Sequence, residues 1–212
     1  MDCCSVNYLN KEFNQAWARK ELKGYRKRGL AKRARKLADL LTQQGLSGAT
    51  LLEVGCGIGA LHQELLGRGA TRVVGVDASH AYIEVAGELA EEMGSQDRVE
   101  YHAGNFVDLE AELPKVEVVV LDRVICCYPD MKSLVSASSR HATKLYALSY
   151  PRRNWPVRAG MLTFNLLYIL FRRHFRIFAH KPSEVSAMLE TQGFNRIVRS
   201  THFVWELAVY AR

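Results

Sequence analysis

The densest group of residues able to do chemistry lies in the stretch LLEVGCGIGAL, residues 51–61. An apolar run ends here in three glycines at alternate positions, Gly55, Gly57 and Gly59, which predicts a strand that turns sharply into a helix. Glycines at such a turn let the backbone approach a ligand closely. A dinucleotide site uses the same arrangement, with a helix N-terminus facing a pyrophosphate. The acidic Glu53, just before the first glycine, is unusual beside a phosphate, because like charges repel at short range.

A second acidic residue, Asp77, ends the run RVVGVD at residues 72–77. A carboxylate at the end of a second strand can accept hydrogen bonds from both hydroxyls of a ribose. It can also cap the helix that follows, and it fits a dinucleotide site, although the chain shows no second nucleotide-binding half. The residues alone leave these interpretations of Asp77 open.

Strand and helix patterns alternate regularly around these residues. The expected strands cover residues 50–55, 72–77, 98–104, 116–122 and 143–150, and the helices between them cover residues 58–67, 79–93 and 130–140. This alternation predicts parallel pairing with right-handed crossovers, and so an α/β fold with a doubly wound, Rossmann-like sheet. A helix follows Pro182, and the closing runs within residues 196–212 lie too close together for a crossover helix. They should form an antiparallel hairpin that completes seven strands.

Two segments fall outside this alternation. Residues 10–22 and 29–44 should be helices joined by a glycine-flanked hinge, with the cations of the second helix, Arg33 among them, facing outward. Residues 157–178 read as one long apolar helix with basic ends. We expect an N-terminal helical cap or lid over residues 1–44. The main domain should cover residues 45–212, with an apolar helical insertion at about residues 151–180.

The charge distribution and the cysteine content limit which partners and sites the chain is expected to have. The net charge is +7, yet residues 11–36 hold 11 Lys/Arg against two acids, and residues 151–183 hold seven and no acid. The rest of the chain is acidic, so a partner with negative charge is compatible with the two basic segments. The five cysteines, which include Cys3 and Cys4, are odd in number and lack a CxxC spacing. They indicate neither a disulfide framework nor a metal site, and with no visible signal peptide we expect a cytoplasmic protein.

The runs EVGCGIG and VVGVDAS, together with the closing hairpin, resemble the class I S-adenosylmethionine-dependent methyltransferases. The resemblance covers about residues 45–212 and implies S-adenosyl-L-methionine as cofactor. This cofactor carries a sulfonium and an ammonium but no phosphate, which suits an acid at position 53. With the lid included, the cofactor-binding residues are expected to be Tyr25, Arg26, Glu53, Gly55, Cys56, Gly57, Gly59, Asp77, Ala78, Asn105, Phe106, Asp122 and Arg123.

The resemblance also places residues after the third and fourth strands. Asn105 stands where the family commonly has an acid that contacts the adenine amino group, and its amide oxygen can accept from that amine. The stretch LDRVICCYPD follows the fourth strand. Enzymes of the family have residues at this place that face both the sulfonium and the substrate. Asp122 and Tyr128 are the catalytic candidates there, and Arg123 could instead pair with Asp122. Side chains expected to be structural or at the surface are Cys126, Cys127, His62, His80 and His141.

With YRKRGL and SYPRRNW added, the chain resembles more loosely a bacterial group grouped with magnesium-protoporphyrin O-methyltransferases. We expect in-line methyl transfer to a small, apolar, anionic acceptor. The apolar helix would form one wall of the acceptor site, and Arg152, Arg153 and Arg158 would favour the anion. Two alternatives stay open: an RNA or protein methyltransferase, and a catalytically silent cofactor-binding module. Nucleic acid is not expected as a partner, whereas peripheral membrane contact through residues 158–176 and a homodimer are left open.

Overall fold

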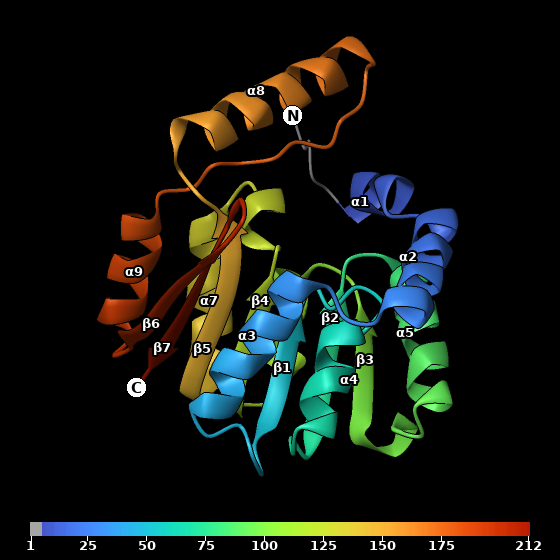
Figure 1. Cartoon of the computed structure of the whole chain (residues 1–212), viewed down its shortest axis with the longest axis vertical. Helices are drawn as coiled ribbons and strands as arrows, with labels where there is room; N and C mark the ends of the chain where they lie inside the picture. Colours follow the sequence, from blue (N-terminus) through green and yellow to red (C-terminus); the bar gives the residue numbers. More distant parts are fainter. Residues whose placement is uncertain (1–5) are drawn as a thin grey trace.

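A computed structural model describes residues 6–212, so the predictions for Cys3 and Cys4 lie outside the described residues. Within that range seven strands form one sheet in the order β3-β2-β1-β4-β5-β7-β6 (Figure 1). The strands are β1 Thr50–Val54, β2 Arg72–Asp77, β3 Val99–Ala103, β4 Val116–Asp122, β5 Ala142–Pro151, β6 Asn195–His202 and β7 Trp205–Ala211. The first five pair in parallel, and β7 runs antiparallel to both β5 and β6. The predicted doubly wound sheet with a closing hairpin is confirmed.

Helices cover both faces of this sheet (Figure 1). One face carries α3, α4 and α5, with α2 packed along α5, and the other carries α6, α7 and α9. Helix α8 lies across the edge of the sheet at which β4 and β5 end (Figure 1). The helices are α1 Val6–Glu12, α2 Gln15–Arg28, α3 Lys32–Gln43, α4 Ala60–Gly67, α5 His80–Glu92, α6 Phe106–Leu109, α7 Met131–His141, α8 Trp155–Leu170 and α9 Pro182–Thr191.

The central strand β4 shows why this stretch of sequence is so apolar. Its side chains alternate between the two faces of the sheet. Val118 and Val120 pack into the core formed with α3 and α4, whereas Val119 and Leu121 pack into the core formed with α7 and α9. All four are at most 1% exposed, as expected for a parallel strand covered on both faces.

The N-terminal segment differs from its prediction. Two helices, α1 and α2, replace the single helix expected over residues 10–22, and Asn14 caps α2 by accepting the N–H groups of Ala16 and Trp17. Helix α2 then continues through Gly24 to Arg28, so the predicted hinge is wrong over most of its length. The chain breaks only at Gly29, whose φ is 69°. Packing of α2 along α5 offsets the roughly 1 kcal/mol that a glycine costs inside a helix.

The apolar insertion is also shorter as a helix than predicted. Helix α8 ends at Leu170, the chain turns at Arg172 with φ 54°, and residues 173–181 return as an irregular segment beside the helix. The side chain of Asn165 holds this segment. Its Oδ1 accepts from the Ile177 N–H at 2.9 Å and its Nδ2 donates to the Ile177 carbonyl at 2.8 Å. The helix predicted to reach residue 178 is therefore wrong beyond residue 170, because this amide satisfies the backbone of the returning chain.

Candidate functional site

The turn after β1 is built from glycines in the left-handed region. Gly55, Gly57 and Gly59 have φ values of 67°, 56° and 79°. A β-carbon at Gly55 would come within 2.5 Å of Val124 Cγ2, and one at Gly59 within 2.6 Å of His62 Nε2. Side chains at these positions would be strained and would collide with their neighbours. The sequence thus yields a tight backbone turn at the carboxyl edge of the sheet.

Asp77, at the end of β2, ties this turn to the next helix. Its Oδ2 accepts the N–H of Gly57 and its Oδ1 accepts the N–H of Ser79, both at 2.9 Å. Burial raises the pKa of Asp77, and the two N–H donors oppose that rise. Next to it, Ala78 is half-buried, whereas Cys56 is buried, which raises the pKa of the Cys56 thiol. The Asp77 carboxylate both caps the chain locally and keeps lone pairs for a further donor.

Glu53 is enclosed rather than open. Its side chain is 3% exposed, and its Oε2 lies 2.6 Å from Nδ1 of His62. The Nε2 of His62 in turn lies 2.8 Å from the Tyr101 hydroxyl. Burial raises the pKa of Glu53, and His62 opposes that rise. The expectation that His62 lies at the surface is wrong, because the buried carboxylate requires a partner; His80, by contrast, is exposed.

The ends of β3 and β4 are joined through side chains. The Tyr128 hydroxyl donates to Asn105 Oδ1 at 2.9 Å, and Asn105 Nδ2 donates to Asp108 Oδ2 at 3.0 Å. Phe106 is buried in the core, edge-on to His141 with ring centroids 5.9 Å apart. The surface position expected for His141 is wrong, since this residue is 8% exposed. Asn105 therefore meets Tyr128 directly, while Phe106 contributes packing beneath them.

Asp122, at the end of β4, is held by Arg33 from α3. The Arg33 Nε donates to Asp122 Oδ1 at 2.9 Å, and its Nη2 donates to Oδ2. The Ser149 hydroxyl donates to the same carboxylate, and the Arg33 guanidinium lies 5.2 Å from the ring centroid of Trp205. Arg33 is buried, so its predicted outward position is wrong. The sequence does indicate that Arg33 is buried, because Arg33 lies four residues before Leu37 and so on the apolar stripe of that helix.

The loop after β4 turns at Arg123, which has a φ of 64°. Its Nη2 lies 3.7 Å from Glu21 Oε1, so Arg123 faces α2 and leaves the partner role at Asp122 to Arg33. Cys126 is buried and Cys127 is half-buried, with their Sγ atoms 3.7 Å apart. The loop therefore points the Arg123 guanidinium toward α2. It leaves the Cys126 thiol buried and the Cys127 thiol half-buried.

The basic helix α2 lies against acidic residues of α5. Arg19 donates twice to Glu88, and Arg26 pairs with Glu92, its Nε 3.2 Å from Oε2. Tyr25 is half-buried against the cores that α2 and α3 share with the domain. Part of the charge imbalance along the chain is thus neutralised inside the molecule. Arg19 and Arg26 each have an acidic partner on α5 while their side chains stay partly exposed.

Two distant segments meet above the carboxyl edge of the sheet (Figure 1). The Ser79 hydroxyl donates to the Phe13 carbonyl at 2.6 Å, which fixes the chain after α1 over the start of α5. The Phe13 ring lies edge-on to Phe175 with centroids 5.4 Å apart. The Tyr168 hydroxyl of α8 donates to Glu12 Oε1 of α1 at 3.0 Å. Helix α1 and the α8 insertion are therefore in contact at this edge.

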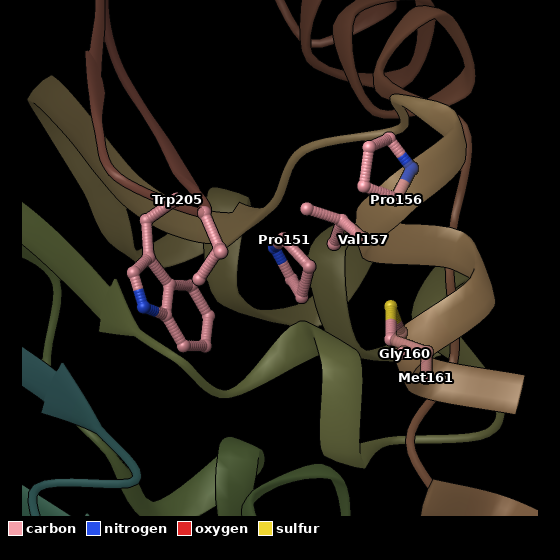
Figure 2. A pocket seen from close by; sticks show the side chains of 7 residues that line it. Pro151, Pro156, Val157, Gly160, Met161 and Trp205 are labelled. Carbon is pink, nitrogen blue, oxygen red and sulfur yellow. The ribbon is translucent and has the colours of Figure 1, made fainter. Parts of the chain in front are cut away.

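A hollow lies where α8 begins, between it and the β6–β7 hairpin (Figure 2). It has a volume of about 330 Å³ and an almost wholly apolar lining: Pro151, Pro156, Val157, Gly160, Met161, Val204 and Trp205. The Trp205 ring that lines it also lies beside the Arg33 guanidinium, which holds Asp122. An apolar hollow next to a buried ion pair at the sheet edge can take an apolar ligand.

Residues 6–212 also bear on two further classes of site, metal centres and membrane spans. In that part of the chain no group of three or more His, Cys, Asp or Glu side chains is arranged to hold a metal ion. Among the helices described there, none is long and apolar enough to cross a membrane.

Comparisons with known proteins bear on this geometry. The family described as a methyltransferase domain matches residues 51–144. Protein arginine N-methyltransferase 1 of Saccharomyces cerevisiae is 39% identical over 70 residues, 33% of this chain and 20% of that protein. A ubiquinone biosynthesis O-methyltransferase of Leptothrix cholodnii is 38% identical over 96 residues, 45% of this chain and 40% of that protein. The chain thus matches less than half the length of these curated relatives.

Among solved structures, magnesium protoporphyrin IX methyltransferase from Synechocystis PCC 6803 with bound SAM is similar in fold. The match has a TM-score of 0.69 at 19% identity and covers 97% of this chain and 94% of that one. At this identity the likeness shows the fold. The strand order and the glycine turn agree with that fold, and residues 51–144 match the methyltransferase domain.

Proposed function

The chain carries a class I S-adenosylmethionine-dependent methyltransferase domain, and on this premise we propose that it methylates a small apolar acceptor that bears an anionic group. The observation that carries the proposal is the Asp77 carboxylate. It stands at the carboxyl end of β2, held by the Gly57 and Ser79 N–H groups beside the glycine turn after β1. Ligands of open α/β sheets bind at this edge.

The residues at this edge suit S-adenosylmethionine. Each Asp77 oxygen accepts one backbone N–H and retains capacity for one ribose hydroxyl. The cofactor's sulfonium supplies an already activated methyl group. Glu53, Cys56 and Phe106 are buried, so we propose that they shape the turn and the adenine side, with Asn105 offering its amide oxygen. Contact through Arg26 would require breaking its pair with Glu92.

The acceptor is proposed to enter the apolar hollow at the start of α8 (Figure 2). Burial of apolar surface there stabilises an apolar acceptor by roughly 25 cal/mol per Å². Arg152 and Arg153 directly follow the lining residue Pro151, and Arg158 directly follows Val157. These cations favour an anionic group on the acceptor.

Methyl transfer by in-line displacement depends on aligning the acceptor atom with the methyl carbon and sulfur, and on excluding water. We propose that Asp122 and Tyr128 line the boundary between cofactor and acceptor. Arg33 and Ser149 fix the orientation of the Asp122 carboxylate, and Asn105 fixes the Tyr128 hydroxyl. A carboxylate acceptor carries no proton to be removed, so this arrangement works by positioning.

The N-terminal helices are proposed to act with α8 as a cover over the bound ligands. The contacts that support this are the hydrogen bond from Tyr168 to Glu12 and the ring contact between Phe13 and Phe175. Both join segments more than a hundred residues apart in the chain. Opening of α1 from α8 would then admit ligands, and closing would exclude water.

Transfer of a labelled methyl group from S-adenosylmethionine tests the proposal. The full chain is offered porphyrin carboxylic acids, aromatic acids and lipid-like acids, alongside RNA and protein as alternative acceptors. We expect transfer to an apolar acid. Met161→Asp, inside the hollow, should lower kcat/KM about tenfold or more, because a charge opposes apolar binding. Met93 is exposed at the end of α5, so Met93→Asp is the matched control and should leave kcat/KM unchanged.

Cofactor affinity, measured in parallel, separates a local effect from unfolding. Met161→Asp should bind S-adenosylmethionine like the wild type. Full activity of this variant would show that the acceptor binds elsewhere. Transfer confined to RNA or to protein would contradict the small-molecule proposal itself.

A further inference from the structure

Helix α8 has a bare apolar face. None of its residues is buried, although the helix is mostly apolar. Its inner side is occupied by the contacts of Asn165 with Ile177 and of Tyr168 with Glu12. On the other side large apolar side chains lie in solvent: Trp155 80%, Leu162 69%, Leu166 66%, Leu167 46%, Ile169 55% and Leu170 71% exposed.

Most of these residues form one stripe. Trp155, Leu162, Leu166 and Ile169 are separated by seven, four and three positions, which is the spacing of one helical face. Phe171 extends the exposed apolar surface past the last turn, at 71% exposed. Exposed apolar side chains scattered singly need no explanation, but a contiguous stripe on a helix indicates an interaction surface.

The hairpin between β6 and β7 adds an aromatic side chain near the start of this helix. Phe203 is 85% exposed and has a φ of 54°. Arg152, just before α8, donates its backbone N–H to the Val204 carbonyl at 2.8 Å and its Nη1 to the Phe203 carbonyl at 3.4 Å. These bonds place the hairpin tip beside the segment that leads into α8.

The charged Lys, Arg, Asp and Glu residues of this segment are all cations. Residues 151–183 contain seven Lys/Arg and no Asp or Glu. Arg173 pairs with Glu12 and Lys181 pairs with Glu184, whose carboxylate also attracts Arg153. Arg152 and Arg153 precede the apolar stripe, Arg172 and Arg176 follow it, and Arg158 lies between Trp155 and Leu162 in the helix.

We propose that the outer face of α8 docks on an anionic lipid surface, the apolar stripe entering the interface and the flanking arginines meeting the headgroups. A helix with an exposed apolar face and basic flanks binds in this way. A symmetric second copy fits less well, because it would place two cationic, acid-free segments against each other. At 16 residues the helix lies along the interface and does not span it.

Flotation of the full chain with vesicles tests this surface. One vesicle preparation is phosphatidylcholine alone, and the other contains about one third phosphatidylglycerol. We expect binding to the anionic vesicles, with little to the neutral ones, and a weakening when salt is raised from about 0.1 to 0.5 M. Leu166→Asp should lower binding about tenfold or more, since a charge replaces a side chain that enters the apolar layer.

Met93→Asp is again the matched control, because Met93 is 53% exposed but lies at the end of α5. It should float like the wild type. Circular dichroism and S-adenosylmethionine affinity of both variants show that the fold and the cofactor site are intact, so a failure here is separate from a failure of the proposed methyl transfer. Absence of flotation, equal binding to neutral vesicles, or a dimer broken by Leu166→Asp would each overturn the proposal.

Discussion

Removing the guanidinium of Arg33 should expose how the candidate catalytic residue Asp122 is held. The side chains of Arg33 and Asp122 are 9% and 10% exposed, so solvent screens the pair little. Arg33→Met keeps the aliphatic stem and loses both donors to the carboxylate. Breaking a buried pair costs about 3–5 kcal/mol, because one charge stays buried without its partner. We expect about 3 kcal/mol, the lower end, since the Ser149 hydroxyl still donates to Asp122.

Urea unfolding followed by circular dichroism measures this loss, and the melting temperature should fall by roughly 6–12 °C in a chain of this size. Arg35→Met is the matched control, because Arg35 lies exposed on the same helix. It should change stability by less than about 0.5 kcal/mol. The double variant Arg33→Met with Asp122→Leu should recover most of the loss, since it removes the unpaired charge as well.

An Arg33→Met variant as stable as Arg35→Met would refute this reasoning. The buried pair would then contribute nothing to the stability of the folded chain. A double variant no more stable than Arg33→Met would refute the narrower claim that the lost stability comes from an unpaired Asp122 carboxylate.

Two further predictions concern other parts of the chain. Glu12→Gln should speed protease cleavage in the segment after α8 about fivefold, because it weakens the charge-assisted bond from Tyr168; an unchanged cleavage rate would count against the contact. Hydrogen bonds from the Thr50 N–H and hydroxyl hold the pKa of Glu117 at about 2, below its ordinary 4.5. That stabilisation is complete above pH 4.5 and is lost as the pH falls through about 2. Glu117→Gln should therefore lower the urea midpoint near neutral pH and approach the wild type only below about pH 2, and a gap independent of pH would contradict this.

The parts of the fold that sequence predicts best are those fixed by local periodicity. The uninterrupted apolar run of β4 required cover on both faces, and the structure supplies it through Val118 and Val119 on opposite sides. The glycine turn and Asp77 were placed correctly at strand ends, because each is set by residues adjacent in the chain. The contacts that such residues make across the sheet are not set by neighbours in the chain.

Long-range partners are where sequence reasoning failed. His62 looked like a surface residue on a helix, yet it lies against the buried Glu53, nine positions earlier and on another element. Arg33 and Asp122 are 89 residues apart, so no local pattern joins them. The end of α8 was missed for a similar reason, because the side chain of Asn165 satisfies backbone twelve residues away. A polar group that needs a partner is visible in sequence, but its partner is not.

The central claim is that the edge beside Asp77 binds S-adenosylmethionine. Titration calorimetry with S-adenosylhomocysteine, the demethylated product, measures it most directly on the wild type, Asp77→Ala and the exposed control Asp39→Ala. Loss of a charge-assisted hydrogen-bond acceptor should weaken binding by about 1.5–3 kcal/mol, or roughly ten- to 150-fold, in Asp77→Ala alone. Binding by the wild type that Asp77→Ala leaves unchanged, or no binding by the wild type, would contradict the account.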